Sequence, residues 1–95
     1  MSILHLVRSS AFNSNNLASA IKTALPNDAF ILLDDGCYCL HHHLLTEDIL
    51  TQYSFSAINT QLSARAISPH SQVTVISVAD LVELSFAHEK VITWQ

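Results

Sequence analysis

Apolar and polar positions alternate along the chain in two rhythms, one typical of strands and one typical of helices. Residues 2–7 and 29–33 are short apolar runs, and both predict strands, the second buried on two faces. Residues 13–16 are rich in helix-capping side chains. Apolar positions with helical spacing follow: Leu17, Ala20, Ile21, Ala24 and Leu25. Because residues 26–28 favour a turn, this part of the chain predicts a strand–helix–strand unit.

The middle of the chain predicts a helix followed by a strand. We expect the helix to begin within a residue or two after Gly36. Its core-facing side would be formed by Leu40, Leu44 and Leu45. Residues 46–48 favour a second short helical turn. Residues 53–57 alternate strictly between apolar and polar, which predicts a strand with one face nearer solvent, towards an edge of the sheet.

The last third of the chain contains two more strand-like segments. Residues 61–67 predict a helical turn, and residues 68–71 interrupt the chain with serine, proline and histidine. Residues 72–76 are β-branched and predict a strand, and residues 90–95 form a β-prone tail.

A helix is predicted between these two strands. Ser77 is placed to cap it, with Asp80 three residues further on. Its apolar stripe would consist of Val78, Leu81, Val82 and Phe86. The alternation of strands and helices predicts an α/β fold: a small three-layer α/β/α sandwich around a mostly parallel sheet of about four to five strands.

The composition suggests one domain over residues 1–95 with a partly covered surface. The chain is 49% hydrophobic and only 13% charged, against roughly 25% charged residues in typical soluble domains. So little charge predicts that another subunit covers part of the surface. No apolar run approaches the ~20 residues needed to cross a bilayer, and no secretory leader is evident, so we expect a soluble, non-exported protein without membrane contact.

The charge balance argues against direct binding of nucleic acid. The formal net charge is −4, and the fixed cations are few: Arg8, Lys22, Arg65 and Lys90. They cannot supply the row of phosphate contacts that DNA or RNA binding requires. The two cysteines lie one residue apart, where a disulfide would close a strained and tiny loop, so free thiols in a reducing compartment are expected.

The segment from Asp34 to Cys39 is the first place to look for chemistry. Cys37 could begin a helix, where backbone N–H groups would lower its pKa and suit a persulfide acceptor. The favoured alternative is a small, buried, inert thiol. Cys39 points to a different side of a helix, and the pair lacks Cys-x-x-Cys spacing. We interpret Asp34 and Asp35 as strand termination and helix capping.

Three further positions invite a functional interpretation. Consecutive histidines at 41–43 diverge by about 100° each on a helix, so they lack the spacing of a metal site and predict a solvated face. His5, inside an apolar strand, is expected to be a hydrogen-bonded core or interface histidine. Trp94 is the leading candidate for anchoring a partner, since aromatic residues dominate interface hot spots.

Several short motifs, taken in order, resemble those of the TusB/DsrH family over nearly the whole chain. They are Leu4-His5-Leu6-Val7, Leu33-Asp34-Asp35-Gly36, Ser63-Ala64-Arg65-Ala66-Ile67, Asp80-Leu81-Val82-Glu83-Leu84 and Val91-Ile92-Thr93-Trp94. The resemblance implies a cytoplasmic subunit of the TusBCD sulfur relay, a heterohexamer with TusC-like and TusD-like sister subunits. That relay passes persulfide sulfur towards 2-thiouridine at the wobble position of transfer RNA, and the resemblance implies that its sulfur carrier is the TusD subunit.

The sequence departs from the family pattern at three places. Residues 8–12 lack the cysteine that some DsrH-type relatives carry, which favours transfer RNA thiolation over sulfur oxidation. Ala66 stands where relatives often have glycine, and Cys37 stands where they often have an aliphatic residue.

Together these features predict a non-catalytic structural subunit with no cofactor and no metal. The alternative is an active persulfide carrier that uses Cys37, with Cys39 as a second acceptor. A free-standing metal-binding module is the least favoured hypothesis.

Overall fold

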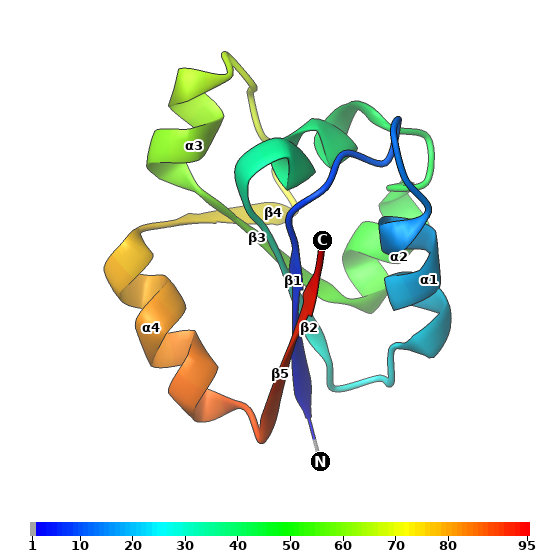
Figure 1. The fold of residues 1–95 in the computed structure, drawn as a ribbon, viewed down its shortest axis with the longest axis vertical. Helices are drawn as coiled ribbons and strands as arrows, with labels where there is room; N and C mark the ends of the chain where they lie inside the picture. The colour runs from blue at the N-terminus through cyan, green and yellow to red at the C-terminus, as the bar shows by residue number, and fades with distance from the viewer. Residues whose placement is uncertain (1) are drawn as a thin grey trace.

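The computed structural model describes residues 2–95 as an all-parallel five-stranded sheet with helices on both faces (Figure 1). The strands are β1 (Ile3–Val7), β2 (Ala29–Leu32), β3 (Ser54–Ile58), β4 (Val73–Ile76) and β5 (Lys90–Trp94). Their order across the sheet is β4-β3-β2-β1-β5. The predicted α/β/α sandwich is therefore confirmed, with every strand pair parallel.

Helices connect the strands and cover the two faces unequally. The helices are α1 (Asn16–Thr23), the 3-10 helix η1 (Asp34–His41), α2 (Glu47–Gln52), α3 (Asn59–Ala64) and α4 (Val78–Ala87). In Figure 1, α1 and α2 lie on one side of the sheet and α4 lies on the other. None of the helices within residues 2–95 has the length and apolar character needed to cross a membrane.

Two apolar clusters, one on each face of the sheet, form the core. The larger contains buried side chains of the sheet, such as Phe30, and side chains that α1, η1, α2 and α3 pack on it, among them Leu17, Cys37, Leu50 and Leu62. The smaller lies under α4 and contains Leu4, Ile31, Leu33, Ile58 and Ile76. Alternate residues of the central strands enter opposite clusters, which is why β2 reads as a continuous apolar run.

The structure corrects three expectations about these elements. β3 is an internal strand, because β4 pairs along its outer side. Ser56, which sequence alternation placed nearer solvent, is 6% exposed. The 3-10 helix η1 begins at Asp34, before Gly36, and ends before Leu44. On α4, only Leu81 of the predicted stripe packs on the core, whereas the other three members are exposed.

The backbone conformation after α3 shows why glycine would suit the position that Ala66 occupies. Ala66 has φ 54°, the left-handed region that favours glycine. Its N–H donates to Ser63 O, and Ile67 N–H donates to Leu62 O, so this turn is a complete Schellman motif. Ala66 therefore holds a backbone conformation that glycine would adopt without strain.

We expect Ala66→Gly to raise the free energy of unfolding by about 0.5–1 kcal/mol. The left-handed conformation costs alanine about 1–2 kcal/mol, and the extra flexibility of glycine in the unfolded chain offsets about 0.4–1 kcal/mol of that relief. Urea unfolding followed by circular dichroism measures the change. Ala64→Gly, in the last helical position of α3, is the matched control and should destabilise; a loss of stability with Ala66→Gly would contradict the strain.

Candidate functional site

The carboxyl ends of β1 and β2 meet through an unusually close backbone contact. Leu33 N–H donates to the Val7 carbonyl oxygen at 2.9 Å as the chain leaves β2. Gly36 then passes the same carbonyl so closely that a Cβ there would lie 1.9 Å from Val7 O. Because Gly36 does not have a positive φ, its role is to permit close approach. The glycine thereby seats η1, with both cysteines, against the end of β1.

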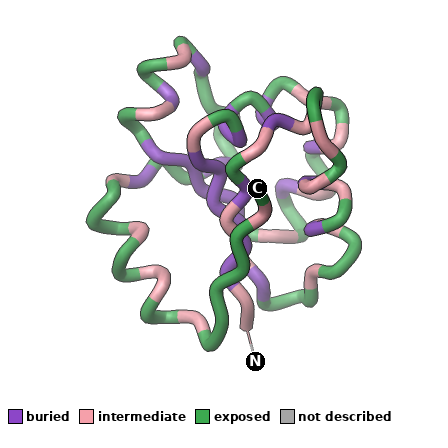
Figure 2. The backbone as a smooth tube through the Cα atoms, in the orientation of Figure 1, coloured by how far each residue is buried: buried purple, intermediate pink, exposed green. Residues whose placement is uncertain are grey.

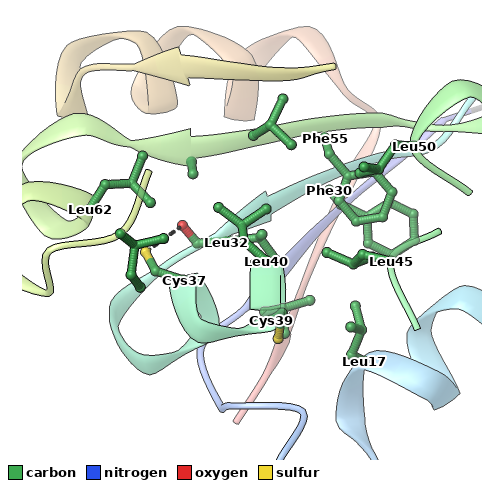
Figure 3. Packing of buried hydrophobic residues seen from close by; sticks show 14 of the residues in the cluster. Leu17, Phe30, Leu32, Cys37, Cys39, Leu40, Leu45, Leu50, Phe55 and Leu62 are labelled. Atoms are coloured by element: carbon green, nitrogen blue, oxygen red, sulfur yellow. Dashed lines mark hydrogen bonds between the residues drawn. The ribbon is translucent and has the colours of Figure 1, made fainter. Parts of the chain in front are cut away.

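Both thiols point from η1 into the larger core cluster (Figure 3). Cys37 and Cys39 are each 0% exposed. The Cys37 Sγ donates to Leu32 O at 3.7 Å, and the Cys39 Sγ donates to Ser9 O at 3.6 Å. The thiols are free, but each is directed at a backbone carbonyl inside the protein.

Burial also makes these thiols weaker acids than an exposed cysteine. It raises the pKa of Cys37 to about 11, with the nearby Arg65 charge opposing and Asp34 adding to the rise. Burial likewise raises the pKa of Cys39. Because the thiolate is the nucleophilic form, a raised pKa lowers the reactivity of both groups at neutral pH. Cys37 is a small buried thiol, as the favoured interpretation held, and its pKa is raised, whereas activation by a helix N-terminus would lower it.

Asp34 and Asp35 form ion pairs beside the carboxyl end of β2. Arg8 Nε contacts Asp34 Oδ2 at 2.9 Å, and Arg65 contacts Asp35 Oδ1 at 3.4 Å. The Asp34 N–H donates to Gln61 Oε1 at 2.8 Å. The strand-ending role of the two aspartates is present, but η1 has no side-chain cap, so the predicted capping was wrong. The pairs link the loops after β1, β2 and α3.

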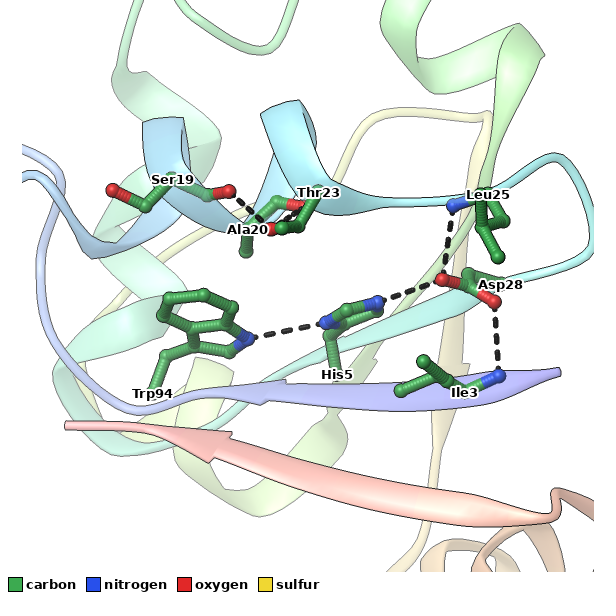
Figure 4. A network of polar contacts seen from close by, with 8 residues as sticks. All are labelled: Ile3, His5, Ser19, Ala20, Thr23, Leu25, Asp28 and Trp94. Carbon is green, nitrogen blue, oxygen red and sulfur yellow. Dashed lines mark hydrogen bonds and ion pairs between the residues drawn. The ribbon is translucent and has the colours of Figure 1, made fainter.

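His5 and Trp94 belong to a buried polar network that centres on Asp28 (Figure 4). His5 Nε2 lies 2.9 Å from Asp28 Oδ2, and the Trp94 Nε1–H donates to His5 Nδ1 at 3.1 Å. An indole nitrogen only donates, so His5 Nδ1 must accept and Nε2 must carry the proton towards Asp28. The tautomer of His5 is fixed from both sides.

Asp28 accepts hydrogen bonds from two backbone amides as well. The Ile3 N–H donates at 2.9 Å and the Leu25 N–H at 3.0 Å. Burial raises the pKa of Asp28, but the hydrogen bonds from Leu25, His5 and Ile3 outweigh that effect and hold the pKa below its usual value of 3.8. The network ties the start of β1, the turn after α1 and the end of β5 together.

The network shows where the two interface candidates lie: His5, expected to be a core or interface histidine, and Trp94. His5 is 1% exposed and stacks on Phe30, with ring centroids 4.8 Å apart, so it offers no surface to another subunit. Trp94 is partly buried and packs against the larger core cluster of its own chain. Sequence reasoning missed Asp28, because an acidic residue in a turn after proline gives no signal of burial.

The three consecutive histidines do not gather metal ligands around them. The rings of His42 and His43 stack with centroids 4.3 Å apart, and Phe12 meets His42 edge-on. Among residues 2–95, no three His, Cys, Asp or Glu side chains lie close enough together to hold a metal ion.

Comparison with known proteins agrees with this architecture. The family model described as "DsrH like protein" matches residues 9–91. The chain belongs to the DsrH-like family. The resemblance seen in the sequence motifs is thereby confirmed, and this DsrH-like protein is a member of a sulfur-relay family. No curated protein matches it.

Two solved structures share the fold of this DsrH-like protein. The ychN protein from E. coli superimposes with a TM-score of 0.78 at 15% identity, covering 98% of each chain. Protein Tm0979 from Thermotoga maritima has a TM-score of 0.64 at 23% identity, covering 94% of this chain and 95% of its own. At these identities the likeness concerns the fold.

Proposed function

We propose that this DsrH-like protein is a non-catalytic structural subunit of a TusBCD-type sulfur relay in the cytoplasm. In that role it holds TusC-like and TusD-like sister subunits in a heterohexamer, and sulfur passes through a neighbour towards 2-thiouridine at the wobble position of transfer RNA. The observation that carries the proposal is the complete burial of both thiols.

A persulfide carrier needs a thiolate that a donor can reach. The thiolate attacks the outer sulfur of the donor's S–SH group, a new S–S bond forms, and the donor departs as its own thiolate. Cys37 is enclosed on every side. The rise of its pKa from 9.0 to about 11 also lowers the thiolate fraction at neutral pH about 100-fold. Access and ionisation therefore both argue against a carrier role.

The surface composition supports a role within a larger assembly. Only 13% of the residues are charged, and the described chain leaves large apolar side chains exposed on several elements, including Val75, Phe86 and Val91. Partner subunits would remove such side chains from water.

We expect Cys37→Ser to leave sulfur transfer through the relay unchanged. The experiment first co-expresses this chain with TusC-like and TusD-like subunits and measures the mass of the purified assembly. Transfer RNA thiolation is then compared for wild type, Cys37→Ser and the matched variant Cys39→Ser. Cys37→Ala is a second variant in case a buried hydroxyl impairs folding.

Direct thiol labelling provides an independent readout. With a disulfide reagent, the native protein should react at least about 100-fold more slowly than the denatured protein. Loss of thiolation with a folded and assembled Cys37 variant would establish the alternative function, a persulfide carrier. A stable monomer that ignores both sister subunits would refute the structural role itself.

A further inference from the structure

Helix α4 is apolar on nearly all sides, yet it has no fully buried residue. Seven of its ten residues, Val-Ala-Asp-Leu-Val-Glu-Leu-Ser-Phe-Ala, are apolar. Figure 2 shows the helix in green and pink throughout. A helix that is apolar all round is normally enclosed in a core. Here α4 covers the smaller core cluster alone, through Leu81 and Leu84.

The uncovered apolar side chains form one continuous row along the helix. Val78 is 56% exposed, Val82 is 50% exposed and Phe86 is 84% exposed. Their spacing of four residues makes them a ridge of the kind that packs into the grooves of a second helix. A free phenylalanine at the end of such a ridge is a suitable hot spot for a partner.

An acidic groove lies along the other flank of the same helix. It has a volume of about 600 Å³ and runs between α4 and strands β3 and β4. Its lining includes the carboxylates of Asp80 and Glu83 and the hydroxyls of Ser54, Ser56 and Thr74. Ser56 is 6% exposed. The groove thus presents acceptors with no cation among its lining residues.

These charges decide which occupant fits. Helix α4 carries Asp80 and Glu83 and contains no lysine or arginine. Two copies of the chain joined through α4 would bring like charges together, which disfavours self-association. A partner with lysine or arginine beside its own apolar ridge would pair with the acidic groups instead.

We propose that the outer surface of α4 is the docking site for a different α/β subunit, one that presents an apolar helix flanked by basic side chains. The ridge Val78–Val82–Phe86 packs against the partner helix, and a partner lysine or arginine enters the groove beside Glu83. This inference rests on the proposed function, which supplies sister subunits, and it assigns to their binding a surface separate from both thiols.

The test measures assembly with the sister subunits by mass and by titration. Phe86→Asp is expected to weaken binding at least about 30-fold. Glu83→Lys is expected to slow association and to reduce its dependence on salt. Phe12→Asp and Glu47→Lys repeat the same changes on exposed residues elsewhere and should bind as wild type. Thermal melting checks that every variant is folded.

The outcomes separate this inference from the proposed function. If Phe86→Asp binds the sister subunits as tightly as wild type, or if Phe12→Asp weakens binding equally, the docking site is overturned and the structural role still stands. Failure of the wild type to assemble would overturn both. Sedimentation of the isolated chain completes the test: a homodimer that Phe86→Asp abolishes would assign the surface to a second copy instead.

Discussion

Gly36→Ala is expected to lower the free energy of unfolding by at least about 3 kcal/mol. The added Cβ would lie 1.9 Å from the Val7 carbonyl oxygen and 2.8 Å from its carbon. Both atoms belong to the backbone of a central strand, which cannot move aside as a flexible side chain can. A native domain is stable by only about 5–15 kcal/mol, so a drop in melting temperature of at least about 12 °C is expected by calorimetry.

Asp35→Ala is the matched control for this variant. It introduces alanine one position earlier in η1, where the carboxylate is exposed and its ion pair with Arg65 spans 3.4 Å. Such exposed pairs contribute about 0–1 kcal/mol, so the control should melt close to wild type. Wild-type stability of Gly36→Ala would mean that η1 does not rest against β1.

Asp28→Ala is expected to lower the free energy of unfolding by about 3–5 kcal/mol. The substitution removes the acceptor of three donors at once: the amides of Ile3 and Leu25 and the His5 imidazole. His5 cannot relieve the loss by changing tautomer, because its Nδ1 is already committed to the Trp94 N–H. Denaturant titration measures the change. Asp48→Ala, an exposed acidic residue in α2, is the control, and equal effects would argue against the network.

The pH dependence of stability provides a second check on Asp28. Its pKa in the folded protein is below the usual 3.8, so the ionised form stabilises the fold fully at neutral pH. This contribution begins to fall as the pH drops below about 4 and is lost through the folded-state pKa. The stability difference between wild type and Asp28→Ala should therefore shrink in acid. A difference that stays constant to low pH would exclude this linkage.

Local sequence patterns predicted the fold but not how its elements meet. The apolar runs placed the strands, and Ser77 with Asp80 forms the expected capping box of α4. The start of η1 was predicted wrongly because glycine is a poor helix former. In the structure, Gly36 lies inside η1, where its lack of a side chain allows close approach to the Val7 carbonyl oxygen. Ser56 resembled a solvent-facing residue because a polar side chain lining a groove alternates like one on a surface.

The contacts within the candidate site were even harder to predict from the sequence. His5 and Trp94 were each singled out for their residue type, but nothing in their neighbours along the chain indicated that they bond to each other. Asp28 gave no signal. The apolar stripe of α4 was recognised, yet periodicity cannot distinguish a face that packs on its own sheet from one that remains exposed.

The pairing of β1 with β5 also sets a constraint on biosynthesis. β1 is synthesised well before its neighbour β5, with which it pairs from Ile3↔Lys90 to Val7↔Trp94. Until β5 has been made, β1 therefore has an open edge of unpaired amides and carbonyls. The nascent chain should depend on a chaperone or on rapid completion of synthesis to avoid pairing with neighbouring chains.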